Sequence, residues 1–171
     1  MRRPHCVAVV LTALVIAACA PGSGSAGSDA ETPDDVGEIN TDPASLGEVT
    51  LTVWDQEVRG GQDAQIEALN AAFQDEYPNI TIERVSRSFE DLQATLRLAI
   101  TDDEPPDVVQ ANNGRADMGA FVQAGLLTNL DPYREAYAWP DRFPASILSY
   151  SSYTEDGVTF GEGSLWGLPQ M

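Results

Sequence analysis

The residue with the clearest chemistry is a cysteine near the N-terminus. Cys19 ends the run Ile16-Ala17-Ala18-Cys19, which follows two arginines and the apolar stretch from Val7 to Ile16. Small residues before the cysteine are what a signal peptidase accommodates beside its cut. The pattern is typical of a lipobox, whose cysteine is acylated, for example with palmitate. We therefore expect residues 1–18 to be a lipoprotein signal peptide and Cys19 to carry lipid; the alternative is a plain signal peptide with an incidental cysteine.

The rest of the chain lacks the side chains of most catalytic and metal sites. The only histidine is His5 and the only other cysteine is Cys6, both inside the predicted signal peptide, and the sequence contains no lysine. Zinc sites of Cys and His, histidine-dependent triads, disulfides, Walker A loops and Schiff-base lysines are thereby excluded from the mature chain. We expect no metal and no cofactor. An enzyme would have to use carboxylates, and Asp55 with Glu57 is the pair placed to act as acid and base.

The charge balance narrows the class of partner. The sequence has 9 basic and 27 acidic residues, a net charge of −18, and removal of Arg2 and Arg3 with the signal peptide leaves 7 against 27, or −20. Binding to nucleic acid or to anionic lipid headgroups needs basic patches that displace counterions. We therefore expect no nucleic-acid partner and no electrostatic docking on a membrane.

Composition divides the remaining chain into two parts. Residues 19–47 are rich in Gly, Ser, Pro and acidic side chains and contain almost no large apolar residue. Such a segment cannot bury a core and is predicted to be a flexible acidic tether. Residues 48–171 are predicted to form the folded part, because apolar and β-branched residues begin to alternate with polar ones there.

Periodicity predicts strands and helices that alternate along the folded part. Strands are expected at residues 49–54, 80–85 and 107–110. Between the first two strands, Ile66, Leu69, Phe73 and Tyr77 form an apolar stripe that predicts a helix ended by Pro78. Further helices are expected after a Ser88 cap, over 116–124 with Gly125 as its stop, and over 131–137 and 143–150. A turn at 155–157 and a loop before 165–169 complete the pattern.

This order is typical of an α/β fold with a mainly parallel sheet flanked by helices. Ligands of such sheets bind beyond the carboxyl ends of the strands. The polar side chains at those ends are Asp55, Gln56 and Arg59 after the first strand, Ser86 and Arg87 after the second, and Asn112, Asn113 and Arg115 after the third.

Several segments in this order resemble the extracellular solute-binding proteins of ABC importers, in the sugar-binding, maltose-binding-protein-like branch. The resemblance is carried by Leu51-Thr52-Val53-Trp54, by Phe73 to Ile80, by Pro106-Asp107-Val108-Val109 with Gly125 to Leu130, and by Leu165-Trp166-Gly167-Leu168-Pro169. It covers residues 48–171 and implies a periplasmic-binding-protein-like lobe. Members of this family are about twice this length, so the resemblance implies that this is a partial N-terminal lobe, a fragment whose second lobe follows Met171.

The resemblance also implies a function and a site. The chain would be a non-enzymatic, monomeric receptor that captures a mono- or oligosaccharide for ABC permease subunits, lipid-anchored at the extracellular face of the cell membrane. Amide, carboxylate and guanidinium groups offer paired donors or acceptors to sugar hydroxyls, and aromatic rings stack on sugar rings. The implied ligand-binding residues are Trp54, Asp55, Gln56, Arg59, Asn112, Asn113, Arg115, Trp166 and Gln170.

Other interpretations of these residues stay open. Trp54 and Trp166 also suit a core, Arg115 suits a solvent-facing helix start, and Asn112-Asn113-Gly114 suits a turn with positive φ angles. The alternative functions are a secreted carbohydrate-active enzyme that uses Asp55 and Glu57, and a sensing module on the same fold. Permease genes beside this one favour the importer, and turnover of a substrate favours the enzyme.

Overall fold

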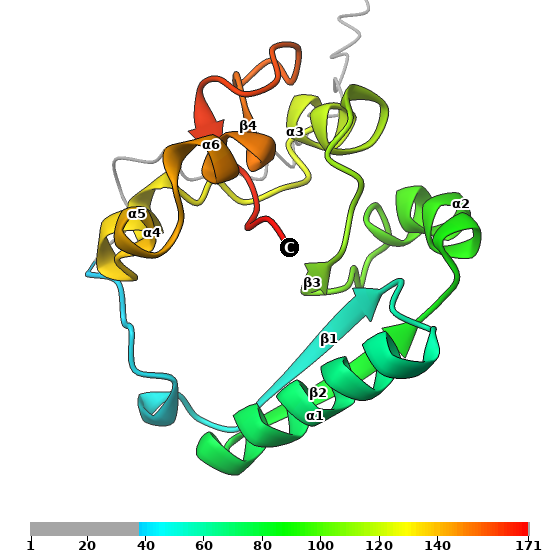
Figure 1. Cartoon of the computed structure of the whole chain (residues 1–171), viewed down its shortest axis with the longest axis vertical. Coiled ribbons are helices and arrows are strands. Elements are labelled where there is room, and N and C mark those ends of the chain that lie inside the picture. Colours follow the sequence, from blue (N-terminus) through cyan, green and yellow to red (C-terminus); the bar gives the residue numbers. More distant parts are fainter. Residues whose placement is uncertain (1–37, 171) are drawn as a thin grey trace, which may run out of the picture. The chain divides into compact units, whose positions relative to one another are not determined.

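The computed structural model describes residues 38–170 and is built on a three-stranded parallel sheet (Figure 1). Its strands are β1 (Val49–Asp55), β2 (Ile80–Ser86) and β3 (Val108–Val109), in the order β2-β1-β3. β1 and β2 pair along their whole lengths, whereas β3 pairs only with Val53 and Trp54. The predicted parallel α/β arrangement is confirmed. The predicted signal peptide and residues 19–37 of the predicted tether lie outside the described residues.

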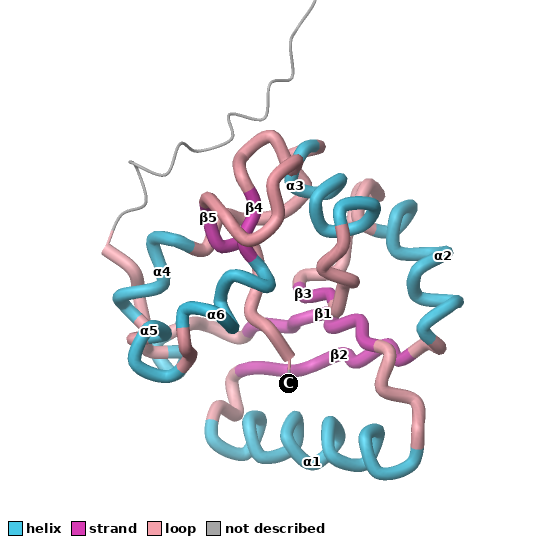
Figure 2. Tube along the Cα trace, turned by 45° about the horizontal axis from the view of Figure 1, so that its top comes forward, coloured by secondary structure: helices cyan, strands magenta, loops and turns pink. Residues whose placement is uncertain are grey.

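Two helices connect the strands, α1 (Gly60–Glu76) and α2 (Phe89–Ala99). The predicted cap of α2 is confirmed, because the Ser88 hydroxyl accepts the Asp91 N–H at 3.1 Å. Because the strand order is β2-β1-β3, the connection from β1 to β2 moves along the sheet in one direction and the connection from β2 to β3 moves in the other. Right-handed crossovers then put the two helices on opposite faces of the sheet, and Figure 2 shows α1 running along β2.

The apolar stripe of α1 is buried less than its spacing predicts. Ile66, Phe73 and Tyr77 are half-buried, but Leu69 is 57% exposed, and no residue of the helix is fully buried. The sheet is narrow on this side, since β3 is only two residues long, and α1 borders open space. Ile66 and Asn70 line that space.

The third predicted helix has a different form from the one expected. Residues Arg115–Gly119 form a π-helical turn, η3, and only Ala120–Gln123 are α-helical, as α3. Gly119 packs so closely on the turn at Gly157 that a Cβ on it would lie 2.7 Å from the Gly157 carbonyl oxygen. The predicted stop is confirmed: Gly125 has φ +67°, and the N–H groups of Gly125 and Leu126 donate to the carbonyls of Val122 and Phe121.

The second half of the described chain consists of short elements. They are α4 (Asp131–Ala136), α5 (Trp139–Arg142), α6 (Ala145–Leu148), the 3₁₀ turn η4 (Ser149–Ser151), and the antiparallel strands β4 (Ser152–Tyr153) and β5 (Ser164–Leu165). The helix expected over 143–150 starts later because Phe143 and Pro144 are extended. The expected turn at 155–157 is present, with a hydrogen bond from the Gly157 N–H to the Thr154 carbonyl. Within the described part of the chain, no helix is long and apolar enough to cross a membrane.

Six of the buried apolar residues form two clusters beside the sheet. One joins Leu96 and Ile100 of α2 to Phe121 of α3. The other joins Met118, Val122 and Tyr153, with Trp166 packed against it. Leu127 contacts both clusters, so it links the layer beside α2 to the β4–β5 pair.

Part of the segment before β1 is docked on the sheet. Asp42 caps a 3₁₀ turn, η2 (Pro43–Ser45), by accepting the Ala44 N–H. The Asn79 side-chain NH₂, in the loop before β2, lies 3.0, 3.1 and 3.2 Å from the carbonyl oxygens of Pro43, Leu46 and Gly47. Residues 43–47 therefore lie at the amino ends of β1 and β2, whereas Asp55 lies at the carboxyl end of β1.

Replacing Asn79 by Ala is expected to loosen this segment. The change removes the only side-chain donor to these three carbonyls among residues 38–170, and loss of about 1 kcal/mol corresponds to roughly fivefold faster local opening. Hydrogen exchange at the Ser45 and Leu46 amides measures this. Asn129→Ala, which removes a hydrogen bond to the Asp131 N–H elsewhere, is the control. Unchanged exchange in Asn79→Ala would contradict the assignment.

Candidate functional site

A hollow of about 760 Å³ opens at the carboxyl ends of β1 and β3. Its walls come from the ends of these strands, from α1, from the loop after β3, from residues 147–151 and from the segment after β5. The polar and aromatic side chains that line it include Trp54, Gln56, Asn70, Gln110, Asn112, Asn113, Tyr150, Trp166 and Gln170. Six of the nine implied ligand-binding residues are among these, and Asp55 also borders the hollow.

Arg84 of β2 holds the carboxyl end of β1 in place. Its guanidinium donates to both carboxylate oxygens of Asp55, at 2.6 and 2.9 Å, and to the Glu57 carbonyl at 2.9 Å. On the other side it donates to Asp63 at 2.8 Å and to Glu67 at 2.5 Å, both on α1. The Arg84 side chain is 7% exposed, so it forms a buried centre that joins β1, β2 and the first turns of α1.

Asp55 is fully engaged in this arrangement. Burial by itself raises the pKa of Asp55, but the hydrogen bonds from Arg84 and from the Glu57 N–H outweigh it, so the pKa is lowered. The pKa of Arg84 is raised, chiefly by its hydrogen bond to Asp55. Asp55 is therefore an ionised group that fixes the strand end, and its oxygens accept bonds from the protein.

The side chains of Gln110 and Gln170 connect the ends of β1 and β3 to the end of the described chain. The Gln110 Oε1 accepts the Gln56 N–H at 2.8 Å, and its Nε2 donates to Glu57 Oε1 at 3.0 Å and to Gln170 Oε1 at 2.6 Å. Gln170 Nε2 donates to Glu57 Oε1 at 3.3 Å. Gln56 itself has no side-chain hydrogen bond among residues 38–170, so its amide is available to a ligand in the hollow.

The loop after β3 presents two asparagines differently. Asn112 is exposed, and its Oδ1 accepts the Gly114 N–H at 2.8 Å, which leaves its NH₂ group without a partner in the described chain. Asn113 donates to the Tyr150 carbonyl at 3.2 Å. Gly114 has φ −70°, and no residue from 112 to 114 has a positive φ, so the turn does not need the left-handed conformations proposed as the alternative.

Both tryptophans combine packing with exposure to the hollow. The Trp54 ring carries the Arg87 guanidinium over its face, 4.6 Å from the ring centroid. The Arg87 Nε is buried without a hydrogen-bond partner in residues 38–170. Trp166 packs on the cluster of Met118, Val122 and Tyr153, and its indole N–H donates to the Tyr153 carbonyl at 3.0 Å. Each ring is therefore held in a fixed orientation.

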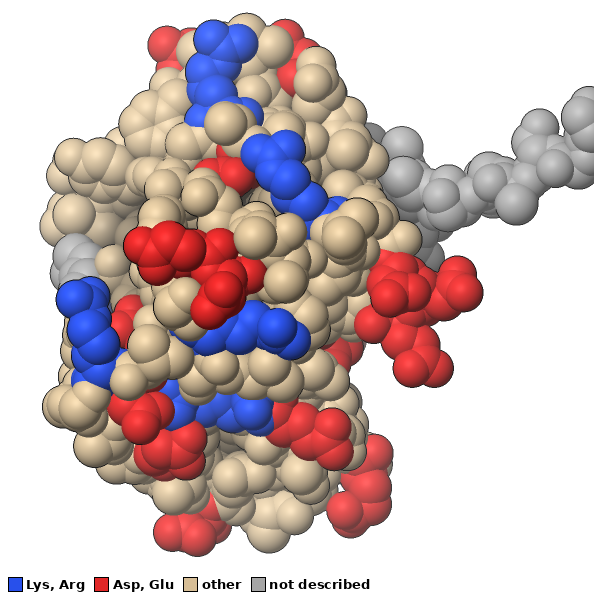
Figure 3. All heavy atoms as spheres, turned by 90° about the vertical axis from the view of Figure 1, so that its right-hand side faces the viewer, with Lys and Arg blue, Asp and Glu red and all other residues tan. Residues whose placement is uncertain are grey.

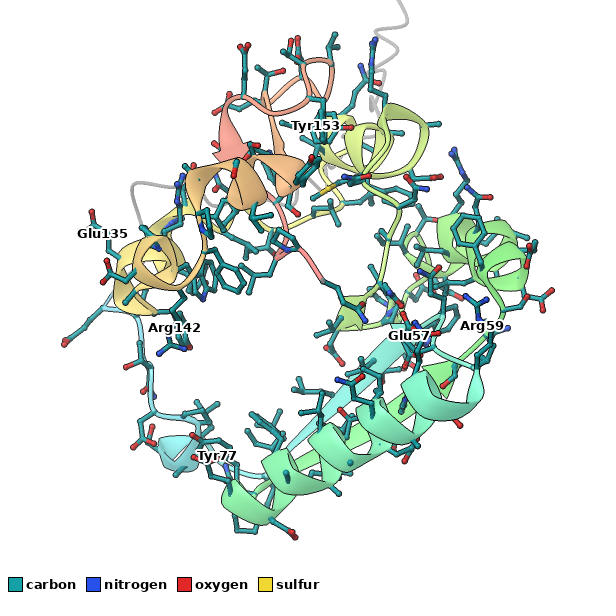
Figure 4. All side chains as sticks on the ribbon, viewed as in Figure 1. Glu57, Arg59, Tyr77, Glu135, Arg142 and Tyr153 are labelled. Carbon is teal, nitrogen blue, oxygen red and sulfur yellow. The ribbon has the colours of Figure 1, made fainter. Side chains whose placement is uncertain are left out.

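The arginines of the predicted site loops do not line the hollow. Arg59 and Arg115 are exposed, and Arg87 lies over Trp54. Figure 4 places Glu57 at the end of β1 and Arg59 farther out, at the start of α1, with Tyr77 at the opposite edge of the sheet. On the face drawn in Figure 3, basic and acidic side chains lie next to one another without a large basic patch. In residues 38–170 no three His, Cys, Asp or Glu side chains gather as metal ligands.

Sequence reasoning missed Arg84 and Gln110. Arg84 follows Ile80 and Ile82 on one face of β2, and a charge on the apolar face of a strand requires carboxylate partners. That signal was available in the sequence. Gln110 directly follows β3, and only the tertiary structure places it between Glu57 and Gln170.

The hollow lies beyond the carboxyl ends of parallel strands, which is where α/β sheets place their ligands. A family model for the bacterial extracellular solute-binding proteins matches residues 59–171. The chain belongs to this family. No curated protein sequence matches the chain.

Solved structures of sugar receptors share the fold. The chain aligns with CpMnBP1, solved with mannotriose bound, at 23% identity and a TM-score of 0.56 over 72% of this chain and 28% of that one. The galacto-N-biose-/lacto-N-biose I-binding protein of a Bifidobacterium longum ABC transporter aligns at 21% identity and a TM-score of 0.56, over 72% of this chain and 29% of that one. The GacH receptor of Streptomyces glaucescens aligns at 23% identity and a TM-score of 0.56, over 73% of this chain and 29% of that one. The chain thus spans less than a third of each of these structures.

The Arg84–Asp55 pair predicts a specific dependence of stability on pH. Because the pKa of Asp55 is lower in the folded state, its contribution is complete above the unfolded pKa near 4 and is lost as the pH falls through the folded value. Asp55→Asn should cost about 3 kcal/mol at pH 7, and the difference from wild type should shrink below about pH 4.

Urea unfolding from pH 7 to pH 2 measures this difference. Asp75→Asn, an exposed carboxylate on α1, is the control and should leave stability within about 0.5 kcal/mol. A constant difference between Asp55→Asn and wild type over the whole range would show that ionisation of Asp55 is not involved.

Proposed function

We propose that this chain is the N-terminal lobe of a receptor that binds an extracellular carbohydrate and delivers it to an ABC permease. The observation that carries the proposal is the chemistry of the hollow. Amides and aromatic rings line it together with aliphatic side chains, and no lysine, arginine or histidine is among its lining residues. Its one lining carboxylate, Asp55, is ion-paired with Arg84. Neutral hydroxyl-rich ligands suit paired amide donors and acceptors.

Two other observations support this class over the alternatives. The family consists of binding proteins, and several solved relatives bind oligosaccharides. For the enzyme alternative, Asp55 would have to exchange protons, but its lowered pKa and its bonds to Arg84 favour a permanently ionised, structural carboxylate. A sensing module would share the site, and only the partner protein separates it from a transport receptor.

We also propose that Cys19 is lipidated and that residues from Cys19 onward tether the lobe. The docked residues 43–47 support the arrangement, because the chain enters at the amino edge of the sheet. The hollow lies at the opposite ends of these strands. A second lobe beyond Met171 would close over the hollow and complete the site.

The sugar proposal predicts binding by the protein encoded when the reading frame is followed past Met171. Thermal shift and calorimetry with mannotriose, lacto-N-biose and acarbose should detect at least one ligand. Gln56→Ala should weaken its binding about fivefold to tenfold, because one direct hydrogen bond is worth about 1 kcal/mol. Gln65→Ala, on the exposed side of α1, should change nothing.

Anionic ligands provide the opposing test. A glucuronate-bearing oligosaccharide and a sugar phosphate should bind more weakly than the neutral sugars, since the lining supplies no cation. Preference for either anion would contradict the proposed ligand class.

The anchor is tested separately by metabolic labelling of the full chain with radioactive palmitate. Label should appear on the wild type and disappear in Cys19→Ala, while Cys6→Ala should keep it, because Cys6 lies within the segment to be removed. Label that survives Cys19→Ala, or a wild type without label, would refute lipidation at this residue.

A further inference from the structure

We propose that Glu57 is a positioning residue that orients the amides of Gln110 and Gln170 for ligand binding. The inference rests on the proposed function for the meaning of the site, and on the hydrogen bonds of Glu57 for the role itself. Glu57 is 8% exposed, and its side chain forms no ion pair within residues 38–170. Its hydrogen-bond partners are two glutamine amides. Glu57 itself does not line the hollow, so direct contact with a ligand does not account for this buried carboxylate.

The carboxylate dictates which way both amides face. A glutamine can bond to an accepting carboxylate oxygen only through its NH₂ group, so each glutamine turns that group toward Glu57. Glu57 Oε1 accepts from Gln110 at 3.0 Å and from Gln170 at 3.3 Å. The Gln110 carbonyl then points at the Gln56 N–H, and the Gln170 carbonyl at the Gln110 NH₂.

Glu57 is itself fixed through its backbone. Its N–H donates to Asp55 Oδ1 at 2.8 Å, and its carbonyl accepts from Arg84 at 2.9 Å. The position of the carboxylate is thus set by the same buried arginine that holds the end of β1. In Figure 4, Glu57 lies at this strand end.

The network also fixes the last described residues against the sheet. Trp166 is held by its own N–H to the Ser151 carbonyl, but residues 167–170 form no backbone hydrogen bond within the described chain. The bonds of the Gln170 side chain to Gln110 and Glu57 connect them to the strand ends. One Gln170 N–H remains unused and lines the hollow, where it can donate to a ligand hydroxyl.

NMR of the uniformly ¹⁵N-labelled full chain tests this role without a ligand. Glu57→Ala should shift the side-chain NH₂ resonances of Gln110 and Gln170, and those of Gln170 should move to the position of an exposed glutamine such as Gln65. Glu57→Gln should largely restore the wild-type positions, because its Oε1 can accept the same two bonds. Glu90→Ala, an exposed change on α2, is the control and should move neither.

The assignment is overturned if Glu57→Ala leaves both resonances in place, or if Glu57→Gln disturbs them as much as Ala does. If Glu57→Ala fails to fold, Gln170→Ala replaces it, since Gln170 is exposed. This change should move the Gln110 resonance and leave that of Gln93, which donates to Asp117, in place. An unmoved Gln110 resonance would also overturn the proposal.

A binding measurement on a full-length receptor that contains the proposed second lobe connects the role to function. Glu57→Ala should weaken binding of mannotriose, lacto-N-biose or acarbose about tenfold or more, and Glu57→Gln by less than about threefold. Equal losses in the two variants would contradict positioning. If the wild type binds none of the three sugars, the proposed function fails, whereas the NMR shifts still decide the role of Glu57.

Discussion

The structure depends on one buried guanidinium. Arg84 brings together Asp55 at the end of β1, Asp63 and Glu67 on α1, and the backbone of Glu57. Burying a charge is costly, and a buried ion pair often adds little net stability. Its consequence here is geometric, because the planar guanidinium satisfies two carboxylate oxygens and a carbonyl at fixed angles. The strand end, the start of the helix and the loop between them therefore adopt one arrangement.

That arrangement explains why few charged side chains line the hollow although the chain is strongly acidic. Asp55 is ion-paired with Arg84, and one carboxylate oxygen of Glu57 accepts hydrogen bonds from Gln110 and Gln170. The rest of the lining consists of amides, aromatic rings and aliphatic side chains. Amides recognise hydroxyls by direction, and their orientation must be imposed, because an amide has both a donor and an acceptor end. Buried carboxylates supply that direction without contacting the ligand.

The amino and carboxyl ends of the strands have different roles. At the amino edge, Asn79 satisfies three carbonyls of residues 43–47 and fixes where the chain enters. At the carboxyl edge, short β3 pairs with only two residues of β1, so the flank of α1 and the end of β3 border the hollow. A parallel sheet presents all its strand ends on one side. The entry of the chain and the hollow therefore lie about 20 Å apart, the length of the seven-residue strand β1.

Local patterns in the sequence determined the order and type of the main elements. Alternation predicted β1 and β2, the Ser88 cap and Gly125 marked helix ends, and the strand ends indicated where polar side chains gather, because these signals act between neighbouring residues. Only the tertiary structure decided that Gly119 lies in a π-helical turn against Gly157. It also decided that Arg59 and Arg115 do not line the hollow, and that Arg84 pairs with Asp55. Each of these depends on contacts between distant segments, whose partners cannot be derived from spacing along one chain.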